Sequence, residues 1–336
     1  MLLKKNWTIY SCVTVIVVLL MISPLHAMSQ ESDNQSKLKD DSNAGNGKVQ
    51  SQPNEPNTGK ANISPIKYEF SLVTRFSLTG DINDGPDKVS INRQEFKFKM
   101  DYMRSMHWQF KLEYNAERSF YDFDNGGELI PGTDNPFDEV NEHQIAFRCL
   151  YVKSMKWMFF TDLKLAYVVG SYTDNDFSDS LLFDVYGGVI WRISNDFSLI
   201  GCFHIENELE DELIILPKVG FQWKILDDLQ LNLLGYKLEF VYELNNRWII
   251  SLLGEYEIRD YRLSEKSLIP GGALADDRVI VAAILTWKLN SLIQIQLQSG
   301  VIPFQVFIIK YSDGHKISED NTKPVGFIGL TATINF

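Results

Sequence analysis

The stretch VGFIGLTATINF, at residues 325–336, decides the fold because its polarity alternates from one residue to the next. Successive side chains of a β-strand point to opposite faces, so one face carries Ile328, Leu330, Ala332, Ile334 and Phe336. The other face carries Thr331 and Thr333. The first face suits lipid and the second suits a polar lumen, which predicts a strand of a membrane β-barrel. An ordinary amphipathic edge strand is the alternative.

The end of this strand resembles the carboxyl-terminal signal that the barrel-assembly machinery reads in outer-membrane proteins of Gram-negative bacteria. The outward-facing side chains that carry the resemblance are Leu330, Ala332, Ile334 and Phe336. The resemblance implies that the chain is assembled into the outer membrane by this machinery. Its further partners would then be outer-membrane lipid and lipopolysaccharide.

The first 27 residues have the order of a secretory signal peptide. Lys4 and Lys5 precede an apolar stretch over residues 9–22, and a short region ending at Ala27 follows. The apolar stretch is shorter than the roughly 20 residues that a membrane helix needs, so we expect cleavage after Ala27. An uncleaved anchor is the alternative.

Residues 28–64 are expected to form a disordered periplasmic tail. From Ser29 to Lys60 the only apolar side chains are Leu38, Ala44 and Val49. Such a segment buries too little surface to offset the entropy of ordering it. The barrel is therefore expected to occupy residues 65–336.

Alternation along the rest of the chain predicts an all-β, transmembrane, antiparallel up-and-down barrel of about 14 strands. Twelve strands are expected to be full-length, and a hairpin at 229–244 is expected to be short because its outward parity switches at Gly235. The expected ranges are 66–80, 89–102, 107–123, 140–151, 156–173, 180–193, 196–207, 213–225, 229–235, 236–244, 247–263, 277–289, 292–310 and 324–336.

The tryptophans are sorted to one end of these strands. Every second connection is short, as periplasmic turns are in such barrels, and each tryptophan beyond the signal lies beside a short connection. Indole rings prefer the interface between lipid and water, so these residues predict a periplasmic aromatic girdle. The six residues are Trp108, Trp157, Trp191, Trp223, Trp248 and Trp287.

The inward positions carry charges of both signs, which leaves two interpretations open. Charged walls could line a water-filled path and set its solute or ion preference. They could also pair across strands and close the lumen. The candidate lumen-lining residues are Arg93, Glu95, Lys97, Lys99, Lys111, Glu113, Glu117, Asp162, Lys164, Arg192, Glu255, Glu257 and Arg259.

The remaining features point away from chemistry at a cofactor or metal. The acidic loops at 122–139 and 206–212 match no calcium-loop spacing. His204 and Glu206 share an inward face with Ser198, but a positioned nucleophile and oxyanion donors are not recognisable, so we assign no catalytic residue. We expect neither cofactor nor metal, and the net charge of −12 opposes nucleic acid as a partner.

Scattered Pro, Gly and aromatic positions within 65–336 also resemble a family of outer-membrane barrels known as a domain of unknown function. They are Pro217, Gly220, Trp223, Gly235, Tyr242 and Gly254. That resemblance implies no characterised activity. From the predicted barrel and its charged inward positions, we expect a passive, porin-like outer-membrane channel for small hydrophilic solutes or ions. A non-conducting structural or surface-interaction barrel is the second hypothesis, and an envelope enzyme is the third.

Overall fold

The computed structural model describes residues 66–82, 86–125, 127, 129–130, 133, 136–170, 177–207, 209–210 and 213–336. The predicted signal peptide at 1–27 and the predicted tail at 28–64 lie outside these residues. Within the described part of the chain, no helix is both long and apolar enough to cross a membrane.

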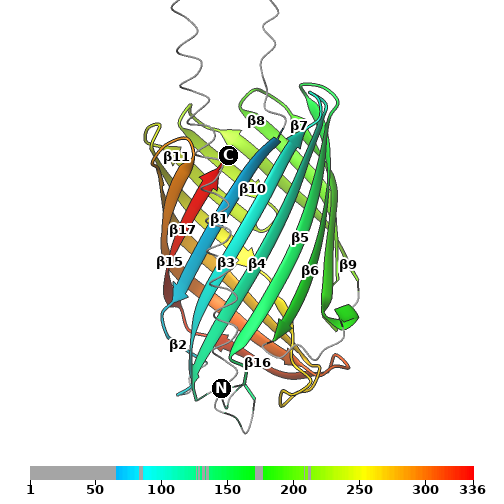
Figure 1. Cartoon of the computed structure of the whole chain (residues 1–336), viewed down its shortest axis with the longest axis vertical. Helices are drawn as coiled ribbons and strands as arrows, with labels where there is room; N and C mark the ends of the chain where they lie inside the picture. The colour runs from blue at the N-terminus through cyan, green and yellow to red at the C-terminus, as the bar shows by residue number, and fades with distance from the viewer. Residues whose placement is uncertain are drawn as a thin grey trace, which may run out of the picture. The chain divides into compact units, whose positions relative to one another are not determined.

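In the described part of the chain, seventeen strands form one sheet, and fourteen of them close into an up-and-down antiparallel barrel (Figure 1). The strand β17 pairs with both β1 and β15, which closes the ring. The prediction of an all-β barrel of about fourteen strands is thus confirmed. In ring order the strands are β1 (Ile66–Ser77), β3 (Lys88–Met103), β4 (Trp108–Asp124), β5 (Glu139–Val152), β6 (Trp157–Gly170), β7 (Leu181–Arg192), β8 (Phe197–Glu206), β9 (Ile214–Lys224), β10 (Leu229–Leu234), β11 (Lys237–Glu243), β12 (Trp248–Glu257), β14 (Ala273–Lys288), β15 (Ile293–Lys310) and β17 (Val325–Asn335).

The short hairpin expected at 229–244 is present as β10 and β11. Leu234 pairs with Lys237 across a two-residue turn, and Gly235 adopts a φ of 57° there. Glycine reaches positive φ without steric cost, which explains why the strand can reverse at this residue. With 6 and 7 residues, β10 and β11 are the shortest strands of the ring.

Apart from the turn at Gly235, the short turns lie at one end of the barrel, and five of them share one hydrogen-bonding pattern. A Ser or Asn side chain accepts hydrogen bonds from the backbone N–H groups two and three residues later. At Asn290, the Oδ1 atom accepts from Leu292 at 2.8 Å and from Ile293 at 2.7 Å. Such bonds stabilise tight turns because they satisfy backbone donors locally. The other four residues are Ser105, Ser154, Ser194 and Asn245.

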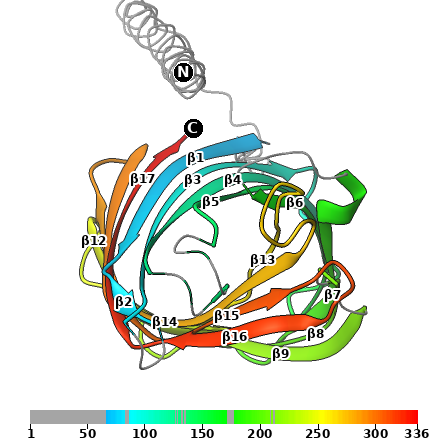
Figure 2. The ribbon, with the colours of Figure 1, turned by 90° about the horizontal axis from the view of Figure 1, so that it is seen from below.

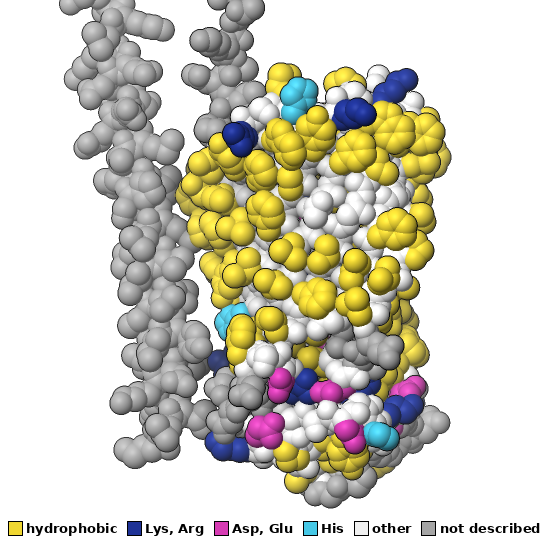
Figure 3. Space-filling view, turned by 90° about the vertical axis from the view of Figure 1, so that its right-hand side faces the viewer, with side chains coloured by type: hydrophobic (Ala, Val, Ile, Leu, Met, Phe, Trp, Pro, Cys, Tyr) yellow, Lys and Arg dark blue, Asp and Glu magenta, His cyan; other side chains and the backbone are white. Residues whose placement is uncertain are grey.

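The outer face of the barrel wall is apolar. Large hydrophobic side chains that point outward are exposed along the strands, among them Leu72, Ile145, Leu165, Leu252 and Leu297. Figure 3 shows such side chains over the middle of the wall, with charged side chains toward both ends. An exterior this apolar is suited to lipid and is unusual on a water-soluble monomer.

One predicted strand is wrong in its carboxyl-terminal part. We expected a single strand over 247–263, but β12 ends at Glu257 and the chain turns into the barrel. The next strand, β13 (Asp260–Arg262), pairs with β14 and bridges to Val169 of β6 (Figure 2). The turn escaped prediction because polarity continues to alternate through Tyr261 and Leu263, which are buried inside the ring.

Three further elements were not predicted. The strand β2 (Gly80–Asp81) pairs with the start of β3, and β16 (Lys316–Thr322) pairs with the end of β15. A short 3-10 helix, η1 (Phe177–Ser180), precedes β7. All three lie at the end opposite the short turns, so they belong to the long connections.

Candidate functional site

The two halves of the lumen differ in the solvent exposure of their inner side chains. Near the short turns, the side chains of Lys97, Lys99, Lys111 and Glu113 retain between a quarter and a third of their exposure. A cavity of about 210 Å³ is bordered there by Lys111, Glu113, Asp162 and Lys164, among others. Water therefore reaches the charged inner wall from the short-turn end.

Toward the long connections, seven inward-facing charged side chains form an ion network. Its members are Arg75, Arg93, Glu117, Glu257, Arg259, Asp276 and Arg278. Glu257 accepts from Arg75 at 3.1 Å and from Arg278 at 2.5 Å and 2.8 Å. The side chains of Arg93 and Asp276 are 1 % and 0 % exposed, so this part of the network is shielded from water.

The ion network crosses the lumen. Arg259, which follows β12, donates to Oε1 of Glu117 on β4 at 2.5 Å. The strands β12 and β4 are separated by β14, β15, β17, β1 and β3, so they stand on nearly opposite sides of the ring. Arg93 of β3 likewise contacts Asp276 of β14, to which Tyr121 and Gln305 also donate at 2.8 Å and 2.6 Å. Charged groups at this level join the two walls.

An apolar plug fills the mouth at the same end of the barrel. Its buried side chains come from connections rather than from ring strands: Ile82, Leu129, Ile130, Phe137, Leu209, Tyr261, Leu263 and Ile269. They pack on inward side chains of the wall, including Val89, Val168, Leu274 and Phe307. The rings of Phe137 and Tyr121 lie 4.9 Å apart in an edge-to-face contact. The burial of these side chains closes the long-connection end of the lumen in this conformation.

Arg262 fastens the plug to neighbouring connections. Its guanidinium donates to the carbonyl oxygen of Asp179 at 2.8 Å and 2.6 Å, and to that of Gly271 at 2.8 Å. It also contacts the carboxylate of Glu210, which lies in one of the acidic loops. Segments that follow β6, β8 and β13 therefore meet at one side chain.

The structure brings some predicted lumen residues together and separates others. Arg93, Glu117, Glu257 and Arg259 join the ion network. Lys164 lies 3.0 Å from Asp184, and the remaining pairs are more local: Glu95 with Lys97 at 2.6 Å, Lys99 with Glu69 at 2.7 Å, Lys111 with Glu113 at 3.2 Å and Asp162 with Arg148 at 2.5 Å. Arg192 and Glu255 are half-buried on β7 and β12.

Sequence reasoning missed the partners of this network on β14. Asp276 and Arg278 are central to it, but we expected the strand to begin at 277, whereas it begins at Ala273. Alternation is lost over residues 273–276, where all four side chains are buried. The sequence did contain a signal for this burial. Ala273, Leu274 and Ala275 are three consecutive apolar residues, and a continuous apolar run is typical of a strand that is buried on both faces.

The tryptophans lie on the outer face next to the short turns. Trp157 stacks on Trp191 with ring centroids 5.6 Å apart, and Trp248 stacks on Trp287 at 5.5 Å. Trp108 packs on Tyr151 at 4.7 Å, and Trp223 contacts Phe197 at 6.4 Å. At the same end, Phe336 exchanges backbone hydrogen bonds with Tyr68 of β1. The exposed faces of these rings are available to an interface.

The histidine considered for catalysis is buried against two carboxylates. Nε2 of His204 lies 3.3 Å from Asp184 and 3.3 Å from Glu206, and these three side chains have the ligand types of a metal site. Lys164 already pairs with Asp184 at 3.0 Å, which works against a bound cation. Ser198 stands six residues away along β8, about 20 Å in an extended strand, so it cannot act as a nucleophile beside His204.

Comparisons with solved structures give barrels of low similarity. An outer-membrane channel from Pseudomonas putida F1 matches at a TM-score of 0.44 and 9 % identity, covering 85 % of this chain and 100 % of the other. A FadL homologue from Pseudomonas aeruginosa matches at 0.41 and 9 %, covering 80 % and 89 %. The Pseudomonas putida toluene transporter TodX matches at 0.37 and 8 %, covering 82 % and 90 %.

No protein-family model matches the sequence, and no curated protein sequence matches it either.

Proposed function

We propose that the chain is an outer-membrane β-barrel that passes small hydrophilic solutes or ions passively, and that its outer mouth is closed in this conformation. The observation that carries the proposal is the contrast between the two faces of one wall. The outer face presents large apolar side chains, whereas the inner face carries charged side chains that water reaches from the short-turn end. This contrast is typical of barrels whose interior is polar.

Passage would require the plug to move. The apolar plug and the ion network together occupy the outer half of the lumen, and Arg262 joins the segments that form the plug. Loss of these contacts would free the segment between β12 and β14 without removing any strand of the ring. A closed resting state with infrequent openings is therefore the expected behaviour.

Recordings of the refolded protein in a planar bilayer test the channel. Wild-type protein should show rare conductance steps, and Arg262→Ala should raise the open probability at least several-fold. Arg118→Ala is the matched control, because Arg118 also pairs with a carboxylate, that of Glu139 at 2.5 Å, but lies on the outer face of β4. Correct folding is checked by heat-modifiable gel migration. Silence of all three folded proteins would refute the channel.

A non-conducting structural barrel is the second candidate. It is favoured by the ion network, whose pairs join opposite walls and whose central members are withdrawn from water. Buried polar networks of this kind hold the side chains of a lumen in fixed positions. In the recordings just described, this candidate predicts no conductance steps from Arg262→Ala, whatever the membrane potential.

The cellular location of the protein is part of the same proposal. The barrel would reside in the outer membrane of a Gram-negative cell, in contact with lipid and lipopolysaccharide. Residues 1–27 would direct its export, and the barrel-assembly machinery would recognise Leu330, Ala332, Ile334 and Phe336. The tryptophans beside the short turns would then mark its periplasmic interface.

A further inference from the structure

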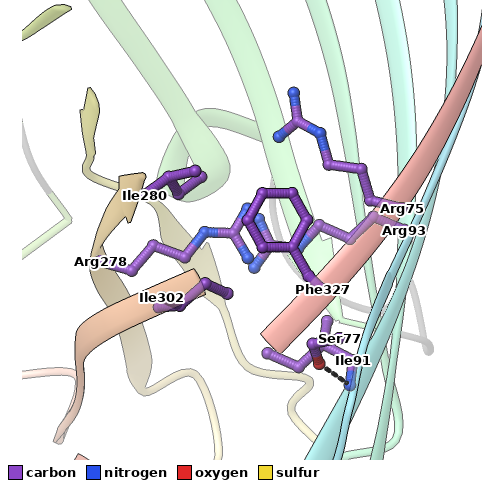
Figure 4. Close-up of a pocket in the computed structure, with 8 residues that line it drawn as sticks. All are labelled: Arg75, Ser77, Ile91, Arg93, Arg278, Ile280, Ile302 and Phe327. Atoms are coloured by element: carbon purple, nitrogen blue, oxygen red, sulfur yellow. Dashed lines mark hydrogen bonds between the residues drawn. The ribbon is translucent and has the colours of Figure 1, made fainter. Parts of the chain in front are cut away.

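A small cavity opens on the inner wall between the ion network and an apolar patch. Three arginines, Arg75, Arg93 and Arg278, line it together with the apolar side chains of Ile280, Ile302 and Phe327 (Figure 4). Ser77 and Ile91 complete its lining. The residues come from β1, β3, β14, β15 and β17, five neighbouring strands of the ring.

The arginines at this cavity have more donors than acceptors. Nε and Nη1 of Arg93 are buried and have no hydrogen-bond partner among the described residues, and neither does Nε of Arg75. The nearest carboxylate oxygens to Nη1 of Arg93, on Glu117 and Glu257, are each 3.9 Å away. A guanidinium offers five N–H donors, and a buried donor without an acceptor is costly. The site therefore lacks an acceptor.

The charges around the cavity also leave an excess. The ion network as a whole holds four arginines and three carboxylates, because Glu117 lies near both Arg93 and Arg259, and Glu257 is shared by Arg75, Arg259 and Arg278. Glu117 is engaged by Arg259 at 2.5 Å, and Glu142 lies 4.0 Å from Arg259, on the strand beyond Glu117. Glu95 is engaged by Lys97 at 2.6 Å. One further negative charge would balance the cavity locally.

We propose that this cavity binds one small monovalent anion of the size of chloride. The free space of about 10 Å³ leaves room for at most one small occupant, and a chloride ion, being somewhat larger than water, would enter with a small shift of the flexible arginine side chains. The guanidinium groups would supply charge-assisted hydrogen bonds, and the Ile and Phe side chains that also line the cavity would exclude competing water. The anion would be held on the lumen wall just inside the plug. A role of this site in transport rests on the proposed channel function, whereas binding of the anion does not.

Crystals of the full-length protein grown in sodium bromide test the site directly. Anomalous density from bromide is expected in the cavity, within hydrogen-bonding reach of Arg93. Its absence from the cavity at molar bromide would overturn the proposal. Bromide binding does not depend on conductance, so this result stands whether or not the barrel conducts.

Unfolding in detergent provides a second test. At constant ionic strength, replacing sodium gluconate by sodium chloride should raise the apparent Tm by about 3 °C for each tenfold rise of chloride above its dissociation constant. Ile302→Phe, which fills the cavity while keeping every charge, should abolish this rise. Ile284→Phe, on the same inner face but outside the cavity, should keep it. Equal Tm values of the wild-type protein in both salts would contradict the proposal.

Discussion

Arg259 and Glu117 meet across the lumen, with Nη1 and Oε1 2.5 Å apart, although their strands stand on nearly opposite sides of the ring. Each residue also contacts other members of the ion network. Arg259 reaches Glu257 at 3.3 Å, and Glu117 lies 3.9 Å from Arg93. This pair joins opposite walls of the barrel like a crossbeam, so its loss should affect the whole half of the barrel on the side of the long connections.

Glu117→Gln is therefore expected to destabilise the barrel strongly. The substitution leaves Arg93 and Arg259 buried with one fewer negative charge, which costs about 3–5 kcal/mol when a buried pair is broken. Urea unfolding in lipid vesicles, followed by tryptophan fluorescence, measures the loss. Glu319→Gln is the control, since its pair with Lys316 is about half exposed and should contribute less than about 1 kcal/mol. Equal effects of the two substitutions would argue against a crossbeam.

Two glycines of the wall should respond differently to the same substitution. A Cβ atom at Gly220 would lie 2.4 Å from the carbonyl oxygen of Leu233 on β10, so Gly220→Ala must push the strands apart. We expect a loss of about 1–3 kcal/mol in the free energy of unfolding.

At Gly254, nothing in the described part of the chain lies within 4 Å of the added atom. Gly254→Ala should therefore leave the free energy of unfolding unchanged or raise it slightly. The two variants are compared in the same urea titration, and a Gly220→Ala barrel as stable as the Gly254→Ala barrel would contradict the strand spacing described here.

The short turn at Asn290 offers a substitution with a built-in rescue. Asn290→Ala removes the acceptor for the N–H groups of Leu292 and Ile293, and should cost about 1 kcal/mol. Asn290→Ser should restore most of that loss, because Ser fills the equivalent place at 105, 154 and 194. Thermal unfolding of the three proteins measures the order, and a failure of Ser to rescue would show that the side-chain acceptor is not what stabilises the turn.

The tryptophans should report a single membrane depth. If the short turns mark one interface, lipids brominated near the headgroup should quench their fluorescence more than lipids brominated near the chain ends. Leu165→Trp is the control, because Leu165 is exposed in the middle of the outer wall and a tryptophan there should be quenched by deep bromine. If lipids brominated near the chain ends quench the wild-type protein more strongly, the short turns do not lie at the membrane interface.

The ring strands could be predicted from sequence, whereas the closure of the lumen could not. Alternation reports which face a side chain takes on its own strand, and this was enough to place Arg93, Glu117 and Glu257 inward. It carries no information on what stands opposite. The contact of Glu117 with Arg259 depends on ring size and on a chain that leaves the wall after Glu257.

The plug escaped prediction for a related reason. Its apolar residues are few and widely spaced in connections that are otherwise acidic, such as Leu129, Ile130 and Phe137 within 122–139. No single connection has a periodic pattern, and the cluster forms only where several connections meet over one opening. Leu209 and Ile269 contribute from two other connections. Long-range convergence of this kind is invisible to a local pattern.

The pairing of β17 with β1 has a consequence for the order of assembly. Phe70 pairs with Ile334, so the seam joins residues 70 and 334, which are almost the whole barrel sequence apart. Before β17 is in place, both β1 and β15 present unpaired backbone donors and acceptors along a full edge. The nascent barrel must therefore be shielded as an open, curved sheet, and only the last dozen residues turn that sheet into a structure without edges.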